Sequence, residues 1–120
     1  MSRSRSAAAA KLTDSAPVFA ALGDATRLSL VARLCVEGPL SIVRLSDGAG
    51  VTRQAVTKHL DALAEAGLVR DSRRGRERIW ELEPRRLERA RLCLDQISDQ
   101  WDATIGRLKA FVEDESESNR

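Results

Sequence analysis

Residues 41–80 constrain the fold more than any other stretch of the chain. Two short helical patterns, SIVRLSDGAG and VTRQAVTKHLDALAEAGLV, flank a turn that contains Gly48 and Gly50. The arginine-rich segment RDSRRGRERIW follows directly, and its Gly75 is placed to fold it back as a two-stranded hairpin. This order is typical of a winged helix-turn-helix, in which one helix enters the major groove and the hairpin, or wing, contacts the backbone beside it. We therefore predict a mainly α fold with a small β-hairpin that binds double-stranded DNA.

The second pattern predicts a recognition helix over about residues 52–66 with one apolar and one polar face. At 100° per residue, Val56, Leu60 and Leu63 fall on the apolar face, which we expect to hold the helix to the domain. Polar side chains on the opposite face can hydrogen-bond base edges in the major groove. The candidate DNA-binding residues of the motif are Ser41, Thr52, Arg53, Gln54, Thr57, Lys58 and His59.

Each side chain of the polar face suits a different partner. Gln54 can contact adenine through two hydrogen bonds, and Lys58 can donate to N7 and O6 of guanine. Thr57 offers a hydroxyl for either partner and a methyl group for thymine, whereas Arg53 can hold a phosphate or a base. We expect His59 to support packing or touch a phosphate. The alternative is that these residues are the ordinary solvated face of an amphipathic helix, and the wing behind them favours DNA binding.

The predicted wing covers about residues 69–82 and concentrates positive charge near its tip. We expect Ile79 and Leu82 to anchor it to the core, with Trp80 on the other face. Arginines at the tip would give affinity that is independent of sequence and sensitive to salt. A solubilising surface loop is the alternative. The candidate phosphate contacts are Arg73, Arg74, Arg76 and Arg78.

Length and composition predict one domain with short tails. The chain has 120 residues, and we expect a disordered basic arm over residues 1–11, a folded domain over 12–115 and a disordered tail over 116–120. No apolar run approaches the length of a membrane span, so we expect a cytoplasmic protein without a membrane partner. Only 3% of the residues are aromatic and none is tyrosine, which argues against single-strand binding by base stacking.

Two further helical patterns precede the motif. The first begins near Ser15 and ends at Gly23, and the second is capped by Asp24 and ends before Pro39. We expect five side chains of the second helix to face inward: Leu28, Val31, Ala32, Leu34 and Cys35.

A long last helix, opened by Pro84, carries apolar residues at alternating spacings of three and four. Such a seam is typical of a helix that packs lengthwise against a partner, so we predict a homodimer through the first and last helices. Two recognition helices related by a twofold axis would call for an inverted-repeat operator. The alternative is that the helix folds back on its own domain. The candidate interface residues are Val18, Phe19, Leu22, Leu94, Ile97, Trp101, Leu108 and Phe111.

The order of elements and their residues resemble the ArsR family of bacterial winged-helix repressors over about residues 18–113. The matching segments are FAALGDATRLSLVARL, GPLSIVRL, VTRQAVTKHLDALAEAGLV, RRGRERIWEL, and Trp101 with RLKAFVE. The chain departs from the family at Ala25, where a proline often starts the second helix. The resemblance implies a dimeric repressor that occupies an operator and blocks transcription, of the branch without metal-ligand motifs.

The family's metal sites have no counterpart among these residues. The segment SIVRLSD lacks the paired cysteines of the family's thiolate site, and His59 is the only histidine, so we predict no bound metal and no cofactor. Cys35 and Cys93 are expected to be reduced thiols that act as small apolar residues. The alternative, from relatives that sense oxidants or persulfides, is a thiol-responsive repressor that uses these two cysteines.

Other classes of function fit the sequence less well. A single histidine and the lack of a glycine-rich phosphate loop argue against an enzyme. A winged helix used for protein–protein contact is the remaining alternative, since a fold does not determine a function. The patterns do not indicate which small-molecule inducer, if any, the protein would bind.

Overall fold

The computed structural model describes residues 13–118, and the chain divides into two units, Met1–Ala90 and Arg91–Arg120. The arm predicted at residues 1–11 lies outside the described residues, as does the end of the tail. The sequence predicted one domain that ends at residue 115, whereas the last helix continues to Ser118. No helix among the described residues combines the length and apolar character that a membrane crossing needs.

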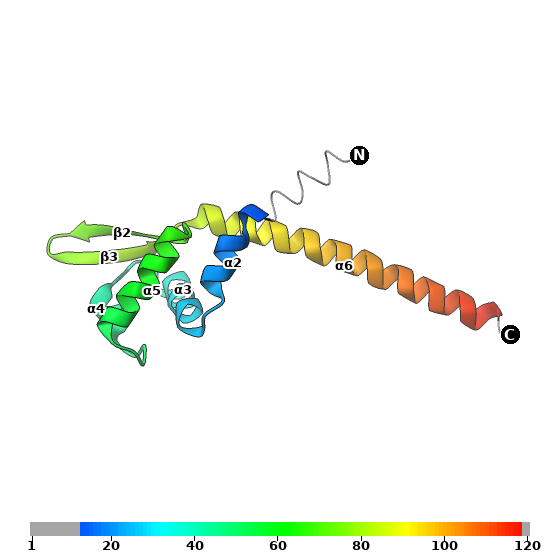
Figure 1. Cartoon of the computed structure of the whole chain (residues 1–120), viewed down its shortest axis with the longest axis horizontal. Coiled ribbons are helices and arrows are strands. Elements are labelled where there is room, and N and C mark those ends of the chain that lie inside the picture. The colour runs from blue at the N-terminus through cyan, green and yellow to red at the C-terminus, as the bar shows by residue number, and fades with distance from the viewer. Residues whose placement is uncertain (1–12, 119–120) are drawn as a thin grey trace. The chain divides into compact units, whose positions relative to one another are not determined.

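The first unit is mainly helical with a small antiparallel sheet (Figure 1). Its sheet has the order β1-β3-β2, and the tip of the β2–β3 hairpin extends beyond the helices. The predicted mainly α fold with a β-hairpin is confirmed, and the two-residue strand β1 is an addition. The elements are α2 (Ala16–Leu22), α3 (Ala25–Glu37), β1 (Leu40–Ser41), α4 (Ile42–Ser46), α5 (Arg53–Glu65), β2 (Val69–Arg74), β3 (Glu77–Leu82) and the start of α6 (Pro84–Ser118).

Three helices of this unit begin at a residue whose side-chain oxygen accepts a backbone N–H three residues further on, which includes the cap predicted at Asp24. This contact satisfies one of the amide groups that have no partner inside a helix. The pairs are Asp24 with Arg27 at 3.0 Å, Ser41 with Arg44 at 3.3 Å, and Thr52 with Ala55 at 3.1 Å.

Two glycines end the recognition helix and turn the hairpin. Gly67 follows α5 with a φ of 78°, and Gly75 opens the two-residue turn between β2 and β3 with a φ of 65°. Both values lie in the left-handed region, where a side chain would strain the backbone. The turn sets the register of the hairpin, in which Arg74 pairs with Glu77 and Val69 with Leu82.

The core lies where α2, α3, α4 and α5 meet the sheet. Leu45, Leu60 and Leu63 are fully buried there, together with Val18 and Trp80. At about 25 cal/mol per Å² of buried apolar surface, these side chains supply the main stabilisation of the unit.

The predicted inward face of α3 is partly wrong. Leu30, Val31 and Leu34 are buried, whereas Leu28 is 53% exposed, and Ala32 and Cys35 are also exposed. The buried residues follow one helical face, and Leu28, Ala32 and Cys35 follow the neighbouring face at the same spacing. Both faces are apolar, so periodicity alone could not choose between them.

The predicted orientation of the wing is also wrong. Trp80 is only 1% exposed, Leu82 packs against the core beside it, and Ile79 stays outside the core. Successive side chains of a strand point to opposite faces, so residues 80 and 82 share a face that residue 79 cannot join. In addition, β1 pairs with β3, with Leu40 opposite Trp80, which places this strand in the middle of the sheet.

The described part of the second unit is residues 91–118 of α6. Its large apolar side chains are mostly exposed in the single chain. Trp101, for example, is 64% exposed. The exposed set comprises Leu92, Leu94, Ile97, Trp101, Leu108, Phe111 and Val112.

Candidate nucleic-acid interface

Helix α5 presents a polar face to solvent because its opposite face is locked into the core. Its contacts with α2, α3, α4 and β2 hold it in place. Arg53, Gln54 and Lys58 are exposed. Within residues 13–118 none of these three side chains forms a hydrogen bond or an ion pair. Their polar atoms are therefore available to another molecule.

Thr57 shares this face but its hydroxyl is already bonded. Its Oγ1 donates to the carbonyl oxygen of Arg53, 3.0 Å away and one turn earlier in the helix. The side chain is partly buried.

The hydroxyl groups of Ser41 and Thr52 cap the starts of α4 and α5. The hydroxyl of Ser41 is used as the cap of α4, and the residue is buried at 7% exposure. Thr52 caps α5 and is exposed at its first turn, beside Arg53. The structure thus does not bring Ser41 to the surface that Gln54 and Lys58 share.

His59 points toward the junction of α2 and α3. Its Nδ1 lies 3.4 Å from Nη1 of Arg27 and 3.9 Å from Oδ1 of Asp24. The backbone N–H of Arg27, helped by the nearby Arg27 charge, holds the pKa of Asp24 below its usual value. This position suits the packing role predicted for His59 and separates it from the other candidate residues.

Two arginines of α3, which the sequence did not single out, brace the helix-turn-helix. Arg27 donates to the carbonyl oxygens of Ala21 at 2.6 Å and Ala20 at 3.4 Å, the last turn of α2. Nη1 of Arg33 donates to the carbonyl oxygens of Leu45 and Asp47, both at 3.2 Å, where α4 ends. Because their partners are backbone carbonyl groups of neighbouring helices and turns, side-chain patterns in the sequence could not have identified them.

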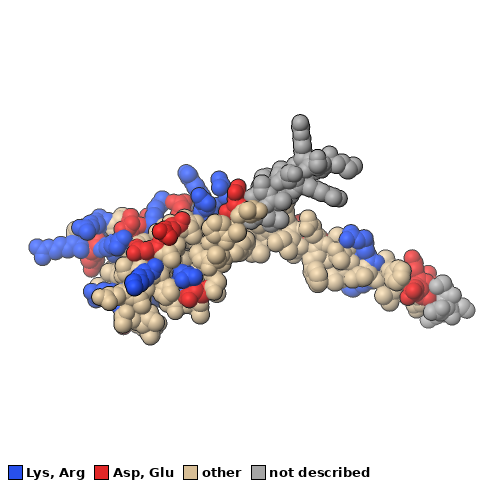
Figure 2. All heavy atoms as spheres, in the orientation of Figure 1, with Lys and Arg blue, Asp and Glu red and all other residues tan. Residues whose placement is uncertain are grey.

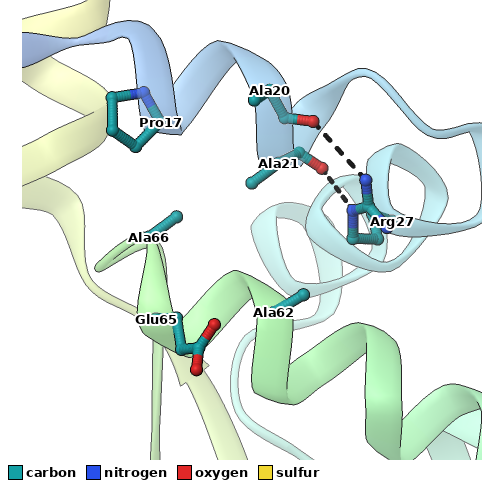
Figure 3. Close-up of a pocket in the computed structure, with 7 residues that line it drawn as sticks. All are labelled: Pro17, Ala20, Ala21, Arg27, Ala62, Glu65 and Ala66. Atoms are coloured by element: carbon teal, nitrogen blue, oxygen red, sulfur yellow. Dashed lines mark hydrogen bonds between the residues drawn. The ribbon is translucent and has the colours of Figure 1, made fainter.

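A shallow groove of about 460 Å³ runs between α2 and α5 (Figure 3). Its walls are mostly small apolar side chains, which let the two helices lie close together. Arg27 lies at one side, bonded to the end of α2 as drawn in Figure 3. The lining residues are Pro17, Ala20, Ala21, Arg27, Ala62, Glu65 and Ala66.

The arginines of the wing fall into two groups. Arg73, Arg74 and Arg76, near the tip, are exposed and form no ion pair within the described part of the chain. Lys and Arg side chains gather over this hairpin in Figure 2. Arg70, at the base, instead binds Glu81 at 2.8 Å and Glu83 at 3.0 Å, and the Glu81 carboxylate raises the pKa of Arg70 above its usual value.

Arg78 belongs to the paired group although the sequence suggested a phosphate contact. Its Nε donates to Oδ2 of Asp71 at 2.7 Å, which lowers the pKa of Asp71, and its Nη2 lies 3.8 Å from Asp61 of α5. The guanidinium also lies over the ring of Trp80, 4.5 Å from its centre. Arg78 therefore ties the wing to the recognition helix.

The residues predicted at the dimer interface differ in how much surface they leave. Val18 is 1% exposed and lies in the core, so it has almost no surface for a partner, whereas Phe19 and Leu22 are partly buried. The candidates on the last helix are all among the exposed apolar residues of the second unit. Of the two thiols, Cys35 is exposed and Cys93 is buried. Residues 13–118 contain no group of three or more metal-ligating side chains close enough to share an ion.

Comparisons with known proteins agree with this geometry. A family model described as a helix-turn-helix domain matches residues 22–71. The HTH-type transcriptional regulator Rv2034 of Mycobacterium tuberculosis is 34% identical over 97 residues, which cover 81% of this chain and 87% of that protein.

Solved structures extend the likeness to the architecture. An ArsR-like transcriptional regulator from Rhodococcus sp. RHA1 superposes with a TM-score of 0.69 at 33% identity, covering 83% of this chain and 93% of that one. The homodimeric winged helix-turn-helix DNA-binding domain of a possible ArsR-family regulator from Mycobacterium bovis gives 0.59 at 27% identity, covering 77% and 83%. With the capped recognition helix and the arginine-tipped wing, these matches show that the chain belongs to the ArsR family of winged helix-turn-helix transcriptional regulators.

Proposed function

We propose that the chain is a sequence-specific transcriptional repressor that binds an inverted-repeat operator as a homodimer in the bacterial cytoplasm. The main support for this proposal is that two sets of exposed side chains have no hydrogen-bond or ion-pair partner within the described part of the chain. Gln54 and Lys58 on α5 and the tip arginines of the wing are exposed without partners among the described residues. The helix and the hairpin are in contact, and an ion pair of 3.8 Å between Asp61 and Arg78 joins them.

The two elements divide the work of recognition. Gln54 suits adenine, Lys58 suits N7 and O6 of guanine, and both can reach base edges from a helix in the major groove. The wing arginines, Arg73, Arg74 and Arg76, contact phosphates, which fixes the register of the protein on the duplex without reading sequence. Arg53, at the first turn of α5, can contact either a base or a phosphate.

Dimerisation through α6 supports the twofold operator. The seam of exposed apolar residues in the second unit would bury its surface against the same seam of a second copy, with Phe19 and Leu22 contributing from α2. The homodimeric Mycobacterium bovis domain is a precedent for this assembly. A twofold pair would place two recognition helices about 34 Å apart, one turn of DNA. Occupying the operator would then block transcription, and neither a catalytic step nor a metal is part of the proposal.

A binding titration tests the function. Duplexes are selected from a random library with the full chain, and the best one is compared with a random duplex of equal length at several salt concentrations. We expect tighter binding to the selected duplex and a steep fall of both affinities with salt. A protein that binds no DNA at low salt would instead support the protein-interaction alternative.

Variants of the recognition helix locate base reading. Gln54→Ala or Lys58→Ala should lose about 1–3 kcal/mol on the selected duplex and much less on the random one. Glu65→Gln, at the other end of the same helix, is the matched control and should leave the preference unchanged. Equal losses on both duplexes for the Gln54 and Lys58 variants would show that bases are read elsewhere.

A further inference from the structure

Thr57 lies on α5 three residues after Gln54 and next to Lys58, and its side chain is partly buried. Side chains three apart are neighbours on a helix surface, so Thr57 would meet the base beside the one that Gln54 reads. A threonine can present either a hydroxyl or a methyl group to that base. These two groups select different bases, and the structure distinguishes between them.

The hydrogen of the hydroxyl is used within the helix itself. Oγ1 of Thr57 donates its only hydrogen to the carbonyl oxygen of Arg53 at 3.0 Å. This bond fixes χ1, because threonine has two heavy atoms on Cβ and few allowed rotamers in a helix. With Oγ1 turned to the backbone, we expect the other substituent on Cβ, the γ-methyl group, to face outward.

We infer that Thr57 reads a thymine through its γ-methyl group, an inference that rests on the proposed function. A methyl group cannot hydrogen-bond, and the apolar feature that the major groove offers it is the C5-methyl group of thymine. The partly buried side chain has limited freedom to turn a different atom outward. Thr57 thus adds an apolar specificity contact to the hydrogen-bonding contacts of Gln54 and Lys58.

The experiment removes one methyl group at a time from either side of the contact. The tightest duplex from the random library is resynthesised with each thymine replaced singly by deoxyuridine, which lacks only the C5-methyl group. Dissociation constants of the full chain are measured by fluorescence anisotropy. We expect one thymine in each half-site to show about a fourfold loss of affinity, the equivalent of roughly 0.8 kcal/mol for one buried methyl group.

Two variants then identify the group of Thr57 that contacts the base. Thr57→Val keeps a methyl group and loses the hydroxyl, so it should retain the fourfold penalty at the same thymine. Thr57→Ser keeps the hydroxyl and loses the methyl group, so it should bind the thymine and deoxyuridine duplexes equally. Thermal unfolding of both variants, followed by circular dichroism, checks that the fold is kept.

Different results would overturn the thymine contact and the proposed function on which it rests. A selected duplex that is bound specifically but is indifferent to every deoxyuridine would overturn the thymine contact alone. A penalty that persists in Thr57→Ser would overturn the inference, because another side chain would then contact the thymine methyl group. A penalty that vanishes in Thr57→Val would also overturn it, because the γ-methyl group without the hydroxyl would then not make the contact. A library from which no sequence is enriched would overturn the DNA-reading function as well.

Discussion

The two units of the chain differ in how far their large apolar side chains are exposed to solvent. The first unit buries leucines such as Leu45, Leu60 and Leu63 completely, whereas the second leaves Leu108 and Trp101 more than half exposed in the single chain. Monomeric proteins rarely expose an extended apolar surface, because each buried side chain contributes about 1.5–3 kcal/mol that exposure forfeits. The first unit therefore stabilises its own fold, whereas the second leaves apolar surface that the proposed dimer would bury.

The same leucine substitution should separate the two units most strongly. Leu60→Ala removes a fully buried side chain and should lower the free energy of unfolding by about 2–5 kcal/mol. Leu108→Ala removes a side chain that is exposed in the single chain, so its smaller effect should depend on protein concentration. Urea unfolding is followed by fluorescence of Trp80 in a Trp101→Phe background, which leaves one reporter in the first unit. Equal, concentration-independent losses would break the distinction between the units.

Removing the largest side chain of the seam should weaken the dimer without unfolding the first unit. Trp101→Ala should cost about 2 kcal/mol of dimerisation free energy, the scale of one buried aromatic side chain. Sedimentation equilibrium measures the dissociation constant, and Lys109→Ala, a polar position of the same helix, is the control. A dimer that stays tight after Trp101→Ala would place the interface elsewhere.

Within the first unit, the wing allows a comparison of arginines with and without a carboxylate partner. Arg74→Ala should weaken binding to selected and random duplexes alike. It should also lower the slope of log Kd against log salt by about 1, the value expected for the loss of one phosphate contact. Arg70→Ala is the matched control, since Glu81 and Glu83 already neutralise Arg70. If Arg70→Ala flattened the salt dependence as much as Arg74→Ala, pairing in the free protein would not indicate which arginines reach DNA.

Features set by neighbouring residues could be predicted from the sequence. The caps at Asp24, Ser41 and Thr52, the apolar face of α5 and the turn at Gly75 each depend on residues a few positions apart. Local hydrogen bonding and helical periodicity are enough to determine them. The fold class followed from their order along the chain.

Features set by the packing of distant segments could not. The two-residue strand β1 exists only because Leu40 pairs with Trp80, and that pairing places Trp80 in the core. The commitment of Arg78 to Asp71 and Asp61 depends on the hairpin register and on how α5 lies against the sheet. For the same reason, the sequence shows how many arginines the wing has, but not which of them form ion pairs with carboxylates.

The smallest expected effect concerns the pair that fixes the wing. Hydrogen bonding from Arg78 lowers the pKa of Asp71 in the folded chain, so between the folded and unfolded pKa values the unfolded state binds more protons. The contribution of the pair is thus present above the ordinary carboxyl pKa and is lost as the pH falls through the lowered value. Both side chains are 41% exposed, which limits the contribution to about 0.3 kcal/mol. Asp71→Asn should therefore unfold at slightly lower urea than the parent at pH 6, and the two curves should converge once the pH falls below the lowered pKa of Asp71. A difference that stayed constant over this range would show that the carboxylate charge is not what matters.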